Sequence, residues 1–258
     1  MTYALITGAS KGIGKALATE LAKRKTNVLL VARSEAALQL LAKQLAETYS
    51  VKTDYLAISL SETQAAEHVL AWCKQKGYQV NMLINNAGYG LSGPFEGNSL
   101  EDNNDMMRLN MLTVVNLCQV FLPMLKSQSK AYILNIASST AYQALPLMSV
   151  YAATKVFVLN FSRALRYELR KSSVSVTVVS PGSTTTDFND RANIGKKARK
   201  AAEKVTMTSE AVANISINAM FAKKTEVVPG LVNKLGKFLA WLMPAALVEQ
   251  TAAGIYED

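Results

Sequence analysis

A serine, a tyrosine and a lysine in the middle of the chain have the types and spacing needed to move a proton. Tyr151 and Lys155 are four residues apart in an expected helix, so their side chains share one helix face. Free tyrosine has a pKa of about 10, and a nearby ammonium lowers that pKa by favouring the phenolate. Ser138 stands thirteen residues earlier, after an apolar run, and can hold a substrate oxygen against the phenol. The three residues predict general acid–base chemistry, whereas Tyr-x-x-x-Lys alone is also typical of a solvated helix face.

The first residues of the chain predict a site for a ligand that contains phosphate. Residues 3–6 form an expected buried strand, the run Thr-Gly-Ala-Ser-Lys-Gly-Ile-Gly follows at residues 7–14, and a helix with an apolar face begins there. A strand, a glycine turn and a helix direct free backbone N–H groups at phosphate oxygens. One glycine would fit any tight turn, but three at this spacing leave room for a dinucleotide where Cβ atoms would clash.

Five landmarks in order make the chain resemble the short-chain dehydrogenase/reductase family. They are residues 7–14, the Asn-Asn-Ala-Gly run at 85–88, Asn110, the set Ser138, Tyr151 and Lys155, and the pair Pro181-Gly182 with Thr186. The resemblance implies an NAD(P)-binding, Rossmann-type α/β domain with a doubly wound parallel sheet. It also implies about seven strands in the order 3-2-1-4-5-6-7, with helices on both faces.

The resemblance and the residues together predict the catalytic roles. Tyr151 donates a proton to the developing alkoxide during reduction, and its phenolate accepts one during oxidation. Ser138 positions the same oxygen, and Lys155 is implied to hold the nicotinamide ribose as well as to act on Tyr151. Asn110 matches the family asparagine that holds a water molecule in a proton relay to the lysine. No Cys/His cluster accompanies the single histidine, His68, so we expect no metal site.

The predicted cofactor site includes the glycine turn and all strand ends that carry landmarks. Its residues are Gly8, Ser10, Lys11, Gly12, Ile13, Gly14, Arg33, Leu60, Asn86, Ala87, Gly88, Tyr151, Lys155, Pro181, Gly182, Thr184 and Thr186. By resemblance, Thr184 and Thr186 contact the carboxamide end of the nicotinamide. Ser59 departs from the family, which often has an aspartate there that bonds the adenine amino group.

The end of the second expected strand predicts a preference for NADP(H) over NAD(H). Chains that select NAD usually place an acidic residue there to bind the ribose 2′-hydroxyl. Here Ala32 occupies that place and Arg33 follows, with a planar guanidinium that can donate two hydrogen bonds to a phosphate. Ser10 and Lys11 can approach the same phosphate. Glu35 could compete for the ribose, but it follows a serine in a pattern typical of a helix start.

Strands and helices alternate along the chain, which predicts βαβ units and a parallel sheet with right-handed crossovers. The expected strands are residues 3–6, 27–32, 54–59, 81–84, 132–137 and 174–179, with a short last strand at Val227-Val228. The longest expected helices are residues 35–49, 102–125 and 151–170. Every landmark falls at the carboxyl end of a strand or on the following helix, where open α/β sheets bind ligands.

We expect one NAD(P)-binding domain over residues 1–258, because no Pro/Gly/Ser-rich linker divides the chain. By resemblance, residues 183–206 form a flap over the substrate, and Tyr89, Tyr142, Gln143 and Leu145 are expected to line the substrate wall. Residues 231–258 form a C-terminal amphipathic helical segment, with a helix end or kink at Pro244.

That C-terminal segment has three interpretations: a helix packed on its own core, a subunit contact, or a helix on a membrane surface. The resemblance favours a homodimer or homotetramer with the segment contributing apolar contacts, and peripheral membrane contact is not favoured. No uninterrupted apolar run reaches the roughly 18 residues of a membrane span, and the first expected strand begins too early for a signal peptide. A cytoplasmic location with reduced Cys73 and Cys118 is therefore expected.

The formal net charge of +9 does not by itself predict nucleic-acid binding. The basic residues are scattered apart from the cluster at residues 196–200, and no stacking aromatic residues accompany that cluster. The sequence therefore predicts an NADP(H)-dependent carbonyl reductase or alcohol dehydrogenase for a small or medium, partly apolar substrate. The alternatives are a non-catalytic dinucleotide-binding regulator, which would not need the catalytic set, and an epimerase or dehydratase on the same scaffold.

Overall fold

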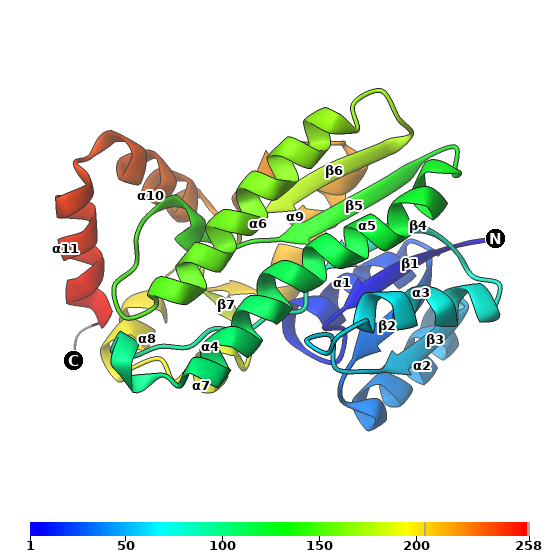
Figure 1. Ribbon diagram of the computed structural model, residues 1–258, viewed down its shortest axis with the longest axis horizontal. Helices are drawn as coiled ribbons and strands as arrows, with labels where there is room; N and C mark the ends of the chain where they lie inside the picture. Colours follow the sequence, from blue (N-terminus) through cyan, green and yellow to red (C-terminus); the bar gives the residue numbers. More distant parts are fainter. Residues whose placement is uncertain (204, 257–258) are drawn as a thin grey trace.

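A parallel seven-stranded sheet with helices on both faces forms the body of the protein (Figure 1). The structure is a computed structural model that describes residues 1–203 and 205–256; residue 204 of the expected flap and residues 257–258 of the expected tail lie outside it. The strands are β1 (Thr2–Thr7), β2 (Asn27–Ala32), β3 (Thr53–Ala57), β4 (Gln79–Asn85), β5 (Ala131–Ile136), β6 (Val174–Val179) and β9 (Glu226–Val227). Their order is β3-β2-β1-β4-β5-β6-β9, which confirms the predicted doubly wound topology.

Strands buried on both faces separate two apolar cores. On one face, α1 (Gly12–Lys23), α2 (Glu35–Tyr49) and α9 (Ser209–Phe221) pack against the sheet, where Ile6 of β1 lies. On the other face, α3 (Ala65–Gln75), α5 (Thr113–Lys126) and α6 (Ser149–Glu168) cover Leu5. Successive side chains of a strand point to opposite faces, so a continuous apolar strand supplies both cores. All crossovers then deliver the carboxyl ends of the strands to one edge.

One long helical run crosses this edge and changes its winding on the way. It consists of α4 (Leu100–Met107), the π-helical turn η2 (Arg108–Leu112) and α5. The Ser99 hydroxyl caps its start by accepting a hydrogen bond from the backbone N–H of Asp102. By length and composition alone this run, Leu100–Lys126, is long and apolar enough to cross a membrane, although it contains no uninterrupted apolar stretch of that length. However, Phe121 and Leu125 pack in the core, as expected for the central helix of a globular domain.

The flap lies over the carboxyl edge of the sheet. It contains β7 (Thr184–Thr185), α7 (Phe188–Arg191) and α8 (Lys196–Glu203), and β7 pairs with β8 (Met207–Thr208). Two single turns, η1 (Phe95–Gly97) and η3 (Ser139–Tyr142), lie in the other loops of this edge. Residues of this segment, including Phe188 and Ile194, line the cavity at this edge.

The tail forms two helices, α10 (Leu231–Leu242) and α11 (Ala245–Tyr256), that project from one end of the molecule (Figure 1). Helix α10 turns its polar side to the domain: Asn233 packs on Gly182, and Lys237 forms an ion pair with Glu226. None of its residues is buried, and the Trp241 side chain is 78% exposed. Its exposed apolar residues are Leu231, Val232, Leu235, Phe238, Leu239, Trp241 and Leu242. The interpretation that this apolar stripe packs on its own core is therefore wrong.

Helix α11 packs differently from α10. Its Ala252 is buried in a small apolar cluster with Ile194 and Ala198 of the flap. Pro244 lies between the two helices, as the predicted helix end at that proline requires. The tail therefore supports the flap through α11 and leaves α10 exposed.

Candidate active site

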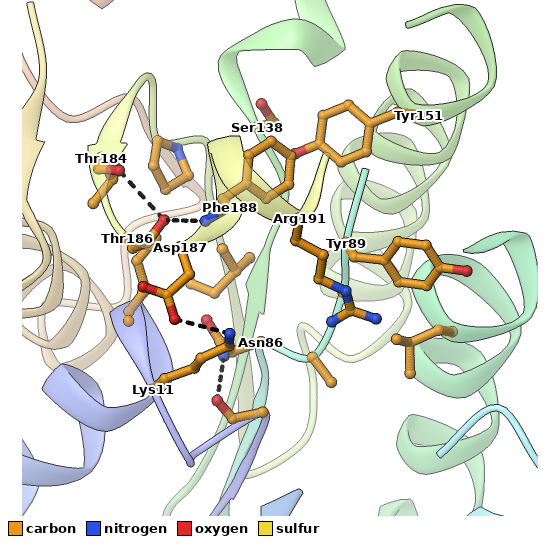
Figure 2. Close-up of a pocket in the computed structure, with 18 of the residues that line it drawn as sticks. Lys11, Asn86, Tyr89, Ser138, Tyr151, Thr184, Thr186, Asp187, Phe188 and Arg191 are labelled. Atoms are coloured by element: carbon orange, nitrogen blue, oxygen red, sulfur yellow. Dashed lines mark hydrogen bonds and ion pairs between the residues drawn. The ribbon is translucent and has the colours of Figure 1, made fainter. Parts of the chain in front are cut away.

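The four predicted catalytic residues meet at the carboxyl edge of the sheet. Ser138 follows β5, Tyr151 and Lys155 lie on α6, and Asn110 lies in the π-turn η2. All four are buried, with exposed fractions of 8% for Ser138, 7% for Tyr151, 5% for Lys155 and 1% for Asn110. Figure 2 shows the Ser138 and Tyr151 side chains at the same end of a pocket. A substrate oxygen placed there would meet both hydroxyl groups.

Lys155 is a buried cation beneath this end of the pocket. Its Nζ donates a hydrogen bond to the Ile136 carbonyl at 3.2 Å and lies 5.7 Å from the centroid of the Tyr151 ring. Burial lowers the pKa of Lys155 to about 8, because the ammonium has lost most of its hydration. The buried side chain therefore places a positive charge next to the Tyr151 ring.

Asn110 holds the loop after β4 against α6. Its amide Nδ2 donates to the Tyr89 carbonyl at 2.9 Å and to the Thr154 hydroxyl at 3.0 Å. Its Oδ1 accepts from the Tyr89 backbone N–H at 3.1 Å. A Cβ on Gly88 would lie 2.9 Å from Asn110 Oδ1 and 3.4 Å from Lys155 Nζ, so the chain must pass here as glycine. The predicted water relay stays a prediction, and the contacts show a positioning role for Asn110.

The predicted glycine turn has the geometry of a phosphate cradle. Gly8 has a φ of +64°, a left-handed conformation that favours glycine, and a Cβ on Gly14 would overlap the Gly8 carbonyl. Asn86 Nδ2 donates to the carbonyls of Thr7 at 3.0 Å and Gly8 at 3.3 Å, which holds the turn open. The Thr7 hydroxyl accepts from the backbone N–H groups of Asn86 and Ala87. Thr7 was not among the predicted site residues, although it begins the motif.

A single cavity of about 590 Å³ joins the glycine turn to the catalytic end. Nearly all predicted site residues line it: Gly8, Ser10, Lys11, Gly12, Ile13, Arg33, Leu60, Asn86, Ala87, Gly88, Ser138, Tyr151, Lys155, Pro181, Gly182, Thr184 and Thr186. Gly14 and Asn110 do not line the cavity; they contact residues that do, Gly8 and Tyr89 respectively. Arg33, Ser59 and Leu60 line the cavity as well as Tyr151, so the cavity runs from the end of β2 past the glycine turn to α6.

The flap closes the cavity at two points. Lys11 Nζ of the glycine turn forms an ion pair of 2.9 Å with Asp187, just before α7. The Phe188 ring packs at a centroid distance of 5.3 Å against the Tyr151 ring and shields it (Figure 2). Gly90 leaves the space that Phe188 fills, since a Cβ there would lie 2.7 Å from the Phe188 ring. The flap thus covers one side of the Tyr151 ring.

The substrate wall differs from the expectation. Tyr89 lines the cavity, but Tyr142, Gln143 and Leu145 do not. The Tyr142 hydroxyl donates a hydrogen bond of 2.7 Å to Glu226 at the start of β9. Glu226 does not line the cavity, so this bond turns Tyr142 away from it. The apolar wall comes from Met148 and from Phe188 and Ile194 of the predicted flap, with Ala198 and Ala202 of α8. Phe188 and Ile194 belong to the segment predicted to cover the substrate, whereas Met148 follows no motif and was not predicted.

A doubly wound sheet with a glycine cradle and a buried Ser–Tyr–Lys set defines a dinucleotide-binding α/β protein with acid–base groups. The sequence profile of the short chain dehydrogenase family matches residues 2–197. The chain belongs to this family.

By their names, the curated relatives include hydroxysteroid dehydrogenases and 3-oxoacyl-CoA reductases. The chain is 29% identical over 236 residues to 17-beta-hydroxysteroid dehydrogenase type 3 of Mus musculus, which covers 90% of this chain and 76% of that protein. It is 32% identical over 183 residues to Very-long-chain 3-oxoacyl-CoA reductase-A of Danio rerio, covering 69% of this chain and 57% of that protein. The match to Hydroxysteroid dehydrogenase-like protein 1 of Gallus gallus spans only 54% of that relative's length.

Solved structures of the family have the same fold. A 7beta-hydroxysteroid dehydrogenase superposes with a TM-score of 0.87 at 25% identity, covering 98% of this chain and 96% of that chain. A short-chain dehydrogenase from Sphingobium yanoikuyae in complex with NADPH gives a TM-score of 0.82 at 27% identity, covering 95% and 98%. Structures of the family thus include complexes with NADP, and the Burkholderia phymatum member, alike in fold, was solved with NAD.

Proposed function

We propose that this short-chain dehydrogenase is an NADP(H)-dependent oxidoreductase acting on a carbonyl or alcohol carbon of a small or medium, partly apolar substrate. The observation that carries the proposal is the single cavity, with Ser138, Tyr151 and Lys155 at one end and Arg33 at the other. The nicotinamide cofactor, when bound, supplies or accepts the hydride.

The residues of the chain supply positioning and the proton. Ser138 Oγ donates a hydrogen bond to the substrate oxygen and sets it against the Tyr151 hydroxyl. Tyr151 gives its proton to that oxygen during reduction and takes it back during oxidation. Lys155 provides a positive charge close to the Tyr151 ring, and Asn110 fixes the loop that faces it. Phe188 excludes water from the pair of hydroxyl groups.

The preference for NADP(H) rests on Arg33. Arg33 lines the cavity, whereas Glu35 is the first residue of α2 and does not. The expectation that Glu35 does not compete for the cofactor ribose is thus consistent with its place in the fold. Lys11 lines the cavity from the glycine turn and forms an ion pair with Asp187 of the flap. Exchange of Asp187 for a cofactor phosphate would let the Lys11 ammonium bind that phosphate.

The apolar wall of Met148, Phe188 and Ile194 supports a substrate with a hydrocarbon skeleton next to the reacting carbon. The relatives named for hydroxysteroids and 3-oxoacyl-CoA point to the same chemistry, a ketone or secondary alcohol on a largely apolar body. We propose a cytoplasmic location, and a homo-oligomer in which the exposed apolar side of α10 contacts a second copy.

The proposed reaction is tested with purified protein, NADPH and a panel of carbonyl compounds. The panel contains a small aldehyde, an aryl ketone, a ketosteroid and a 3-oxoacyl thioester, and the products are identified by mass spectrometry. Reduction of at least one ketone with matching NADPH consumption is expected. Tight NADPH binding without hydride transfer to any compound would favour the regulator, and an isomerised or dehydrated product without net NADPH consumption would favour the epimerase or dehydratase.

A further inference from the structure

An arginine of the flap reaches into the middle of the cavity. Arg191 is the last residue of α7, and it lines the cavity together with the glycine turn. Its guanidinium carbon lies 4.2 Å from the centroid of the Tyr89 ring, in cation–π geometry. Figure 2 shows the side chain descending between Tyr89 and Asn86, away from the catalytic hydroxyl groups. It therefore faces the part of the cavity that a dinucleotide would cross.

A second guanidinium, that of Arg33, lines the same cavity from the end of β2. Burial and repulsion by Arg33 hold the pKa of Arg191 below its usual range, so the two charges act on one another. Among residues 1–203 and 205–256, neither guanidinium has a hydrogen bond or an ion pair within 4 Å. Two guanidinium groups that share one cavity and make no hydrogen bond or ion pair there with the described residues have N–H donors available for an anion.

One carboxylate faces both guanidinium groups. Asp105 of α4 lines the cavity and accepts a hydrogen bond of 2.8 Å from the Tyr89 hydroxyl. Burial alone would raise the pKa of Asp105. Hydrogen bonds from Ser61 and Tyr89 and the charges of Arg33 and Arg191 outweigh that effect, so the pKa lies below its usual value and the carboxyl group is ionised. One negative charge against two positive charges leaves this part of the cavity cationic.

The other arginine of the flap shows what a structural arginine looks like here. Arg199 of α8 donates to the Ile194 carbonyl at 2.7 Å and to the Asn189 carbonyl at 2.9 Å, and it pairs with Asp190. Those bonds tie α8 to α7 within the flap. Arg191 makes no bond of this kind, so holding the flap together does not explain why its side chain points into the cavity.

We propose that Arg191 is a phosphate ligand for the dinucleotide, carried by the flap and acting with Arg33 from the opposite wall. The inference rests on the proposed function, because it requires NADP(H) in this cavity. The planar guanidinium groups bond phosphate oxygens in pairs, and Asp105 competes with the phosphate for both cations. Because Phe188 lies on the same short helix, a phosphate that holds Arg191 also holds Phe188 over Tyr151.

The test measures cofactor affinity directly. NADPH and NADH dissociation constants are obtained by fluorescence titration, and those of adenosine 2′,5′-bisphosphate and ADP-ribose by calorimetry, for wild type and Arg191→Ala. We expect Arg191→Ala to weaken NADPH roughly ten- to a hundredfold, as for loss of a charge-assisted hydrogen bond. Loss confined to NADPH and the 2′,5′-bisphosphate assigns Arg191 to the 2′-phosphate, whereas a loss shared with NADH and ADP-ribose assigns it to the diphosphate.

The matched control is Arg170→Ala. Arg170 also stacks on a tyrosine, with its guanidinium carbon 3.9 Å from the Tyr167 ring centroid, but it lies outside the cavity. The substitution removes the same charge and the same kind of contact, and all four dissociation constants should stay unchanged. If Arg191→Ala binds every ligand as wild type does, the inference is overturned while the proposed function stands. If wild type binds no dinucleotide, both fail.

Two further measurements separate ligand binding from a merely structural role. Asp105→Asn should tighten NADPH several-fold, because it removes the competing charge, and unchanged or weaker binding would refute that role of Asp105. The second measurement uses whichever of adenosine 2′,5′-bisphosphate and ADP-ribose binds more weakly to Arg191→Ala than to wild type. This ligand should slow tryptic cleavage at Lys197 and Lys200 in wild type. Equal protection in wild type and Arg191→Ala would overturn the link between phosphate and flap.

Discussion

Replacing Lys155 by methionine should make the protein more stable at neutral pH while removing its activity. The ammonium of Lys155 is buried, and its pKa falls from 10.5 to about 8 for that reason. A shift of this size corresponds to about 3 kcal/mol of unfavourable free energy in the folded state. Loss of the hydrogen bond to Ile136 offsets about 1 kcal/mol of the gain. We expect a net increase of about 2 kcal/mol in the free energy of unfolding at pH 7.

The pH dependence identifies the cause. The folded-state pKa lies below the unfolded value, so the unfolded protein binds more protons between about pH 8 and pH 10.5 and wild-type stability rises through this window. The advantage of Lys155→Met is therefore complete below pH 8 and disappears as the pH approaches 10.5. Urea unfolding at pH 6.5, 8, 9 and 10 measures it, with the exposed Lys171→Met as control. A destabilised variant, or a difference independent of pH, would refute the reasoning.

The remaining predictions concern catalysis, cofactor choice and assembly. Tyr151→Phe should lower kcat by about 10²–10⁴-fold with nearly unchanged NADPH affinity, and turnover within twofold of wild type would exclude Tyr151 as the acid. Arg33→Ala should weaken NADPH roughly ten- to a hundredfold and leave NADH nearly unchanged in fluorescence titrations; equal losses, or a wild type that prefers NADH, would contradict the assignment. In analytical ultracentrifugation at micromolar concentration the protein should be an oligomer that Leu235→Asp weakens, and monomers in both samples would contradict the α10 contact. Steady-state rates should not change with EDTA, and a loss restored by one added metal would show a missed site.

The order of the sheet and the catalytic pair could be predicted because both depend on short-range patterns. Alternating strands and helices leave few topologies, and four-residue spacing puts Tyr151 and Lys155 on one face of α6 wherever that helix packs. The cofactor residues follow from strand ends, which the topology brings together. The cavity that these residues share was therefore predictable from the topology.

Other features depend on contacts between distant segments, so no local pattern reveals them. The apolar stripe of α10 is visible in the sequence, but its outward direction is set by Gly182 and Glu226, which receive Asn233 and Lys237. Likewise, Tyr142 is close in sequence to the predicted catalytic Ser138 and turns away because its hydroxyl donates a hydrogen bond to Glu226. Spacing predicts which residues share a face, and the neighbours decide where that face points.

The π-turn at Asn110 fixes the rotation of α4 relative to α5 along the long helix. A π-turn holds one more residue than an α-turn, so the side chains before and after it are out of step by about 100° compared with an uninterrupted helix. Met106 before the turn packs in the flap cluster and Phe121 after it packs in the core under the sheet, so the turn fixes the angle between these two contacts. Deleting one residue between Arg108 and Leu112 would convert the π-turn into an ordinary α-helical turn. One half of the helix would then rotate relative to the other, and its side chains would lose their present contacts. Length variation in this helix is therefore a change of catalytic geometry, even where no contact residue is lost.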